Sequence, residues 1–199
     1  PAVVAAITGT MVEGHCAAGV AATLKHFPNQ GSTAEDPHRL DSFSINGPDA
    51  WASFGALPYV DTRAPLVMTG HIRYEGVDNG TPASLSGVIT SWLRANLAYG
   101  GVIVTDDMHV MRGVGSDLTP AQRAIAALRA GADLALFVGT DDAADIVAGL
   151  VAEASVDPAF ADRIAESAAR VLRLKGALGL IPGASATWFD WCVAPSASD

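Results

Sequence analysis

Short apolar runs alternate with longer segments of helical periodicity along this sequence. The short runs predict buried β-strands, because a strand covered on both faces reads as a nearly continuous apolar stretch. The longer segments have apolar residues three and four positions apart, which predicts helices that each bury one face. The strands are predicted at residues 20–24, 65–69, 102–104 and 133–138, and the helices at residues 1–16, 48–55, 84–97, 119–129, 140–151 and 157–175.

This alternation favours an α/β fold. Strand and helix repeat four times at intervals of about 30 to 45 residues, which predicts parallel strands joined by right-handed helical crossovers. A complete TIM-type (β/α)8 barrel needs about 250 residues. The 199 residues therefore predict a partial barrel of about four strand–helix units, or a small open sheet. We expect one domain over residues 1–181 and a short tail, rich in Ser, Ala and Pro, over residues 182–199.

Polar side chains follow three of the four predicted strands. Lys25 and His26 come after the first strand, His71 after the second, and Asp106 and Asp107 after the third. The carboxyl ends of parallel strands meet at one edge of a sheet, so these side chains are expected to gather there. Asp106 is the candidate for the reacting group, and Asp107 is expected to bond to loop amides. A long loop, often a functional feature, is predicted over residues 28–46.

Composition excludes several classes of function. The net charge of −9 and the lack of a basic run argue against binding to nucleic acid or to an anionic membrane surface. There is no apolar run of about 18 residues to span a membrane, and the first residues lack the basic region of a signal peptide. Two cysteines, Cys16 and Cys192, show no CxxC spacing. They predict separate reduced thiols instead of a disulfide framework or zinc site.

Four motifs in a fixed order add a family resemblance. They are Lys25-His26-Phe27-Pro28 followed by Gly31, then Asp36-x-His38, Met68-Thr-Gly-His71 and Val104-Thr-Asp-Asp-Met108. With this order and spacing the sequence resembles glycoside hydrolase family 3, and its pattern is nearest to the β-N-acetylglucosaminidase branch. The resemblance covers about residues 1 to 180. It implies the C-terminal half of a (β/α)8 barrel, with the first four strand–helix units not in this sequence.

The resemblance also implies catalytic roles. Asp106 takes the position of the nucleophile, and His38, paired with Asp36, that of the acid/base. Retaining hydrolysis needs a carboxylate that bonds to the sugar and a separate proton donor. An unshifted Asp is ionised at neutral pH, while a His titrates near it and is oriented by a neighbouring carboxylate. The sequence departs from the family pattern at residues 29–30, which are usually Gly-His, and at Pro37, which is usually Ser.

Three further residues are assigned to the substrate. The resemblance implies that Lys25 and His26 contact the sugar hydroxyls. His71 is placed with them, and a hydrogen-bonding role inside the core is its alternative. A small carbohydrate is the expected ligand, no metal or other cofactor is expected, and the resemblance favours a cytoplasmic location.

The predicted function is that of a retaining exo-glycosidase that hydrolyses terminal β-linked N-acetylglucosamine or a related β-glycoside. One alternative is an inert fragment, or half of a two-chain barrel, because half a barrel exposes two unpaired strand edges. Another is a β-glucosidase or glycoside phosphorylase of the same family. A metal-dependent hydrolase using His26, His71 and Asp106 is disfavoured, because the sequence lacks His-x-His and His-Glu-x-x-His spacings. The oligomeric state is not predicted.

Overall fold

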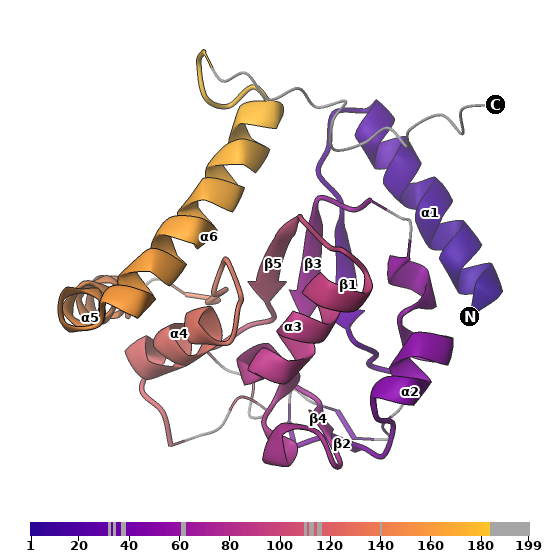
Figure 1. Cartoon of the computed structure of the whole chain (residues 1–199), viewed down its shortest axis with the longest axis horizontal. Coiled ribbons are helices and arrows are strands. Elements are labelled where there is room, and N and C mark those ends of the chain that lie inside the picture. Colours follow the sequence, from indigo (N-terminus) through magenta and orange to yellow (C-terminus); the bar gives the residue numbers. More distant parts are fainter. Residues whose placement is uncertain are drawn as a thin grey trace.

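The fold is α/β and is built on a three-stranded parallel sheet (Figure 1). The computed structural model describes residues 1–31, 33, 35–36, 39–60, 63–109, 111, 114, 117–139 and 141–183. The strands are β1 (Thr23–Phe27), β3 (Leu66–Thr69) and β5 (Val102–Thr105), in the order β1-β3-β5. The predicted α/β class with parallel strands is thereby confirmed, and the sheet is open in this chain.

Helices surround this sheet. Two short strands also occur, β2 (Phe43–Ser44) and β4 (Arg73–Tyr74). The longer helices are α1 (Ala2–Ala17), α3 (Gly87–Asn96), α4 (Pro120–Arg129), α5 (Ala143–Val156) and α6 (Pro158–Ala177). The shorter ones are α2 (Pro48–Ala50), η1 (Trp51–Gly55), η2 (Leu57–Tyr59), η3 (Asp78–Gly80) and η4 (Ala83–Leu85). The helices α4, α5 and α6 pack on one another, and α1 packs against η2 on the other side of the sheet (Figure 1).

Local sequence signals explain several of the helix starts. Ser86 accepts the amide hydrogen of Ile89 and begins α3. Thr119 and Gln122 form a capping box at the start of α4, in which each side chain accepts from the other residue's amide. The Asp157 side chain caps α6 by accepting the amide hydrogens of Ala159 and Phe160. These caps satisfy amide hydrogens that the first helical turn leaves without partners.

The core lies where the central strands meet the helices. All four residues of β5 are buried, in agreement with its continuous apolar run. Phe27, Val67 and Ile103 come from the three strands and belong to one buried cluster that also contains Ile89 and Leu93 of α3. The helix α3 is thus held by its apolar face, as the periodicity of residues 84–97 predicts.

Two of the predicted strands differ from the structure. The first was predicted at residues 20–24, but β1 is Thr23–Phe27 and so includes Lys25 and His26. The prediction of a strand at residues 133–138 is wrong in most of its length, since Leu134 alone forms a parallel bridge, to Val104. Beyond that point one backbone hydrogen bond remains, from Met108 N to the Leu136 carbonyl, while side chains accept two of the segment's amide hydrogens. Thr105 Oγ1 accepts from Leu136 N at 3.0 Å, and an Asp107 oxygen accepts from Val138 N.

The predicted loop over residues 28–46 contains a small element of its own. Within it, β2 pairs in parallel with β4, with Phe43 opposite Arg73 and Ser44 opposite Tyr74. The Tyr74 hydroxyl donates a hydrogen bond to the carbonyl of Asn29. In Figure 1 this two-stranded sheet lies below the arrowheads of β1 and β5, near their carboxyl ends. A two-residue strand has no periodicity, so the sequence pattern could not predict it.

One thiol also differs from its prediction. Cys16, near the end of α1, is disulfide-bonded, so the prediction of a reduced thiol at this position is wrong. Separation along a sequence does not limit which thiols a fold brings within bonding distance. The other cysteine, Cys192, lies outside the described residues. Among the helices that the structure describes, none combines the length and apolar character needed to cross a membrane.

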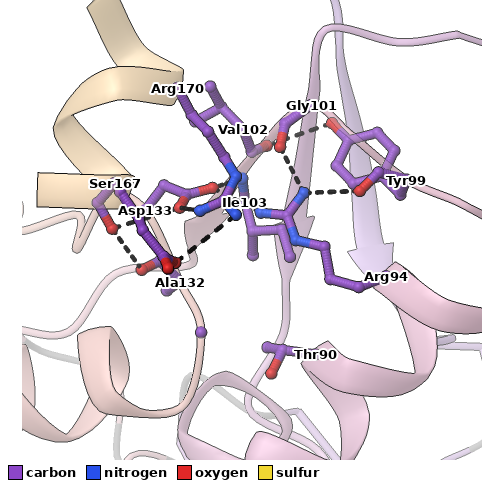
Figure 2. A network of polar contacts seen from close by, with 12 residues as sticks. Thr90, Arg94, Tyr99, Gly101, Val102, Ile103, Ala132, Asp133, Ser167 and Arg170 are labelled. Carbon is purple, nitrogen blue, oxygen red and sulfur yellow. Dashed lines mark hydrogen bonds and ion pairs between the residues drawn. The ribbon is translucent and has the colours of Figure 1, made fainter. Parts of the chain in front are cut away.

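A network of polar contacts joins two helices to the sheet near the amino end of β5 (Figure 2). The Asp133 side chain is fully buried and accepts hydrogen bonds from Arg94 at 2.7 Å, Arg163 at 2.9 Å and Arg170 at 3.0 Å. It also accepts from Ile103 N at 3.0 Å. Arg94 belongs to α3 and the other two arginines to α6, so one carboxylate joins two helices to the central sheet.

Candidate active site

The carboxyl ends of the three strands bring Asp106 and His26 together. Asp106 follows β5, and its amide donates to the carbonyl of Thr69, the last residue of β3, at 2.9 Å. His26 lies near the end of β1, with its Nε2 atom 3.3 Å from Asp106 Oδ2. The two side chains are 20% and 17% exposed. The site is thus partly covered but open to a ligand, as expected for the candidate reacting group.

A glycine permits this approach. Gly70 follows β3 directly, and its amide donates to the Phe27 carbonyl at 3.1 Å. A Cβ atom at Gly70 would lie 3.2 Å from the Cβ of His26, which is closer than most such contacts. The missing side chain lets His26 lie against the end of β3. Gly70 was not among the residues predicted to have a role, although a glycine at a strand end is a signal of close backbone approach.

The surroundings of Asp106 favour its ionised form. Partial burial raises the pKa of this carboxyl, but hydrogen bonds from His26 and from the Asp107 amide, together with nearby histidines, outweigh that effect and lower its pKa to about 2. The Asp107 amide lies 2.9 Å from Asp106 Oδ1. Each oxygen of the carboxylate therefore has a donor. Such a group is a carboxylate at neutral pH, which is the form that a nucleophile requires.

Asp107 has the structural role that the sequence predicted. Its side chain is buried, and Oδ1 accepts from His109 N at 3.0 Å and from Val138 N at 2.8 Å. It therefore joins the turn after β5 to the neighbouring segment. Asp106 and Asp107 are adjacent in the sequence, yet one faces the open edge and the other the interior.

His71 lies at the same edge of the sheet as Asp106 and His26, but its side chain is buried. The residue is only 1% exposed. Its Nδ1 atom is 2.7 Å from Ser84 Oγ and its Nε2 atom is 3.0 Å from the carbonyl oxygen of Asp107. Burial lowers the pKa of His71, and the hydrogen bond to Asp107 and the nearby carboxylates offset only part of that shift. Both ring nitrogens are thus engaged within the protein.

A cavity of about 510 Å³ lies beside β1. Lys25 and His26, the two β1 residues that were predicted to contact the substrate, line this cavity, and Lys25 is exposed. The rest of its wall comes from the start of the long loop, from the region of η1 and η2, and from α1; it includes Asn29, Gln30, Tyr59 and Val4. His26 both lines this cavity and contacts Asp106, so it connects the cavity to the carboxylate.

Of the predicted acid/base pair, Asp36 is among the described residues and His38 is not. The side chain of Asp36 is 54% exposed, with one oxygen 4.0 Å from Nε of Arg39. The Asp36 carbonyl accepts the amide hydrogens of Arg39 and Leu40, each at 3.0 Å. His38 and Pro37 lie outside the described residues.

The residues of the metal-dependent alternative do not form a metal site. Within the part of the chain that the structure describes, no group of three or more His, Cys, Asp or Glu side chains is arranged to hold a metal ion. His26 and Asp106 are in contact, but His71 uses both ring nitrogens elsewhere.

Comparison with known proteins adds a family to this geometry. Residues 1–174 match the model of the glycosyl hydrolase family 3 N terminal domain. The chain is 31% identical over 186 residues to the β-hexosaminidase LpqI of Mycobacterium tuberculosis, which covers 88% of this chain and 47% of the relative. The solved structure of M. tuberculosis LpqI has a TM-score of 0.81 at 29% identity and covers 88% of this chain and 53% of that one.

A second solved structure gives the same result. The β-N-acetylhexosaminidase from Beutenbergia cavernae has a TM-score of 0.75 at 36% identity, over 82% of this chain and 49% of that chain. The chain thus spans about half the length of these relatives.

Proposed function

This chain belongs to glycosyl hydrolase family 3, and on that basis we propose that it carries the nucleophile of a retaining exo-β-N-acetylglucosaminidase. The observation that carries the proposal is the state of Asp106. It lies at the carboxyl end of a central parallel strand, it is partly exposed, and its pKa is lowered to about 2 by donors at both oxygens. The substrate class is supported by the relatives, which are described as β-hexosaminidases and a β-N-acetylhexosaminidase.

In the proposed reaction, an oxygen of Asp106 attacks the anomeric carbon of the terminal sugar. The bond from that carbon to the leaving oxygen breaks, and a glycosyl-enzyme ester forms. His38 gives its proton to the leaving oxygen and then takes a proton from water. That water attacks the anomeric carbon and releases Asp106. Asp36 orients the imidazole of His38 and stabilises its cationic form.

The β1 residues have two different tasks in this proposal. His26 Nε2, 3.3 Å from Asp106 Oδ2, holds the carboxylate in its attacking orientation. Lys25 is exposed on the same cavity wall and offers three hydrogen-bond donors to sugar hydroxyl groups. The cavity is therefore assigned to the terminal sugar, with the anomeric carbon at the end of the cavity where His26 lies beside the Asp106 carboxylate.

The test is turnover of an aryl N-acetyl-β-glucosaminide by the protein and its Asp106→Ala variant. We expect kcat to fall by about a thousandfold or more, because removing a nucleophile removes the covalent route. Azide should restore part of the turnover and give a glycosyl azide of inverted anomeric configuration. Asp162→Ala, which removes an exposed carboxylate on α6, is the matched control and should keep wild-type turnover.

A trapping experiment identifies the nucleophile independently. A 5-fluoro glycoside should leave a covalent sugar on the protein, and peptide mass spectrometry should find that sugar on Asp106. Undiminished turnover by Asp106→Ala, or a trapped sugar on another residue, would refute the assignment.

A further inference from the structure

We propose that His71 and Ser84 are positioning residues, in which a neutral His71 ring holds the Asp107 carbonyl and thereby fixes the turn that carries Asp106. The inference rests on the proposed function of Asp106 as the nucleophile. It gives His71 a role other than the direct substrate contact that the sequence suggested.

The hydrogen bonds determine where the proton of His71 lies. The carbonyl oxygen of Asp107 can only accept, so the His71 Nε2 atom at 3.0 Å from it carries a hydrogen and donates. In a neutral ring the other nitrogen is then an acceptor. The Ser84 hydroxyl, 2.7 Å from Nδ1, therefore donates to it. Ser84 thus selects the tautomer that can hold the Asp107 carbonyl.

Burial keeps this arrangement neutral. His71 is 1% exposed and Ser84 is 0% exposed, so a charged ring would have no access to water. The groups facing the ring include the carboxylates of Asp106 and Asp107, which favour a charge, and the His26 ring, which opposes it. Desolvation is the largest influence among them.

The turn after β5 is held at successive points along its backbone. The amide of Asp106 donates to Thr69, and the amide of Asp107 donates to the Asp106 carboxylate. The carbonyl of Asp107 is held by His71, and its side chain by two amides of neighbouring segments. Without His71, the peptide unit after Asp107 would lose a side-chain donor that comes from the end of β3.

The two residues that follow β3 therefore contact both residues that donate to Asp106, namely His26 and Asp107. Gly70 lies against His26, which contacts one oxygen of Asp106. His71, the next residue, donates to the carbonyl of Asp107, and the amide of Asp107 donates to the other oxygen of Asp106. Two adjacent residues thus fix the distance between the His26 ring and the Asp106 turn.

The test compares His71→Leu, which removes the donor, with His71→Gln, whose amide can replace it. We expect His71→Leu to lower kcat for the aryl glycoside about 100-fold with little change in KM, because a displaced nucleophile slows the chemical step. His71→Gln should recover at least about tenfold of that loss. Ser84→Ala should lower kcat by about tenfold, and Ser91→Ala, a serine change on α3 away from this contact, should leave it unchanged.

Two results would overturn the proposal. One is a folded His71→Leu variant with wild-type kcat, or with a raised KM and unchanged kcat, which would indicate no role or direct substrate binding. The other comes from the ¹⁵N spectrum of the wild-type imidazole, where we expect a neutral ring with its proton on Nε2 at pH 7. A cationic ring or an Nδ1-protonated tautomer contradicts the inference even if the His71 variants fail to fold.

These outcomes differ from a failure of the proposed function. If Asp106→Ala kept full turnover, the nucleophile assignment itself would be wrong. If Asp106→Ala were inactive while His71→Leu and Ser84→Ala were fully active, only the positioning role would be wrong.

Discussion

Replacing Asp133 by asparagine should destabilise the protein by about 3 kcal/mol. Breaking a buried ion pair by removing one partner costs about 3–5 kcal/mol, because the remaining charge is left without compensation. Here the lost charge faces Arg94, Arg163 and Arg170, whose side chains are 23%, 17% and 23% exposed. Asparagine keeps an oxygen for Ile103 N, and the arginines retain some water, so the lower end of that range applies.

The measurement is urea unfolding followed by far-ultraviolet circular dichroism, with the free energy extrapolated to zero denaturant. Glu166→Gln is the matched control. Its carboxylate contacts Arg163 at 3.3 Å and Arg170 at 3.8 Å, but it is 63% exposed. An exposed ion pair contributes about 0–1 kcal/mol, so this control should change stability little.

Salt separates the two effects further. Added NaCl at about 1 M should reduce any cost of Glu166→Gln while leaving that of Asp133→Asn nearly unchanged, since buried charges are screened less. If Asp133→Asn is no more destabilising than Glu166→Gln, the network does not hold α3 and α6 to the sheet in the way described.

Three other predictions follow from single contacts. Gly101→Ala should cost about 1–3 kcal/mol in urea unfolding, because the added Cβ would lie 2.7 Å from the Pro65 carbonyl, whereas Gly100→Ala, with open space around it, should be neutral; equal effects would contradict this. Thr119→Ala should cost about 1 kcal/mol in the same assay through loss of the α4 cap, and an unchanged midpoint would refute that. Asp106 has a folded-state pKa lowered to about 2, so its stabilisation is complete above its unfolded pKa near 3.9 and is lost as pH falls toward 2. Thermal unfolding at pH 5 and pH 2.5 should therefore show a larger loss for the wild type than for Asp106→Asn, and parallel losses would exclude the effect.

The sequence predicts a strand most accurately where the apolar run is also buried in the structure. The run Val102–Val104 is apolar and wholly buried, and β5 lies there. Residues 20–22 are also apolar but lie between the turn at residues 18–19 and β1, and Val20 is 50% exposed. The segment after Asp133 reads as a strand because it is apolar, but Thr105 and Asp107 accept its amide hydrogens through their side chains. In these two segments apolar character predicts neither burial nor the hydrogen-bond partner, since Leu136 is 38% exposed and Val138 is 62% exposed.

The site shows a similar division. Asp106 and His26 were expected at one edge because parallel strands place their carboxyl ends together, and they are in contact. The contact of Gly70 with His26, and that of Ser84 with His71, could not be predicted, because each depends on how separate segments pack. Ser84 was predicted only as the first residue of a helix over residues 84–97.

One of the two shortest strands, β4, contacts both ends of the connection between β1 and β2. Tyr74 in β4 is bonded to Asn29 at the beginning of that connection, while its backbone pairs with Ser44 at the far end. The connection that includes Asp36 is therefore in contact with Tyr74 at both of its ends. Tyr74, which takes no part in the proposed chemistry, thereby links the beginning of the connection to its end through one side chain and its backbone.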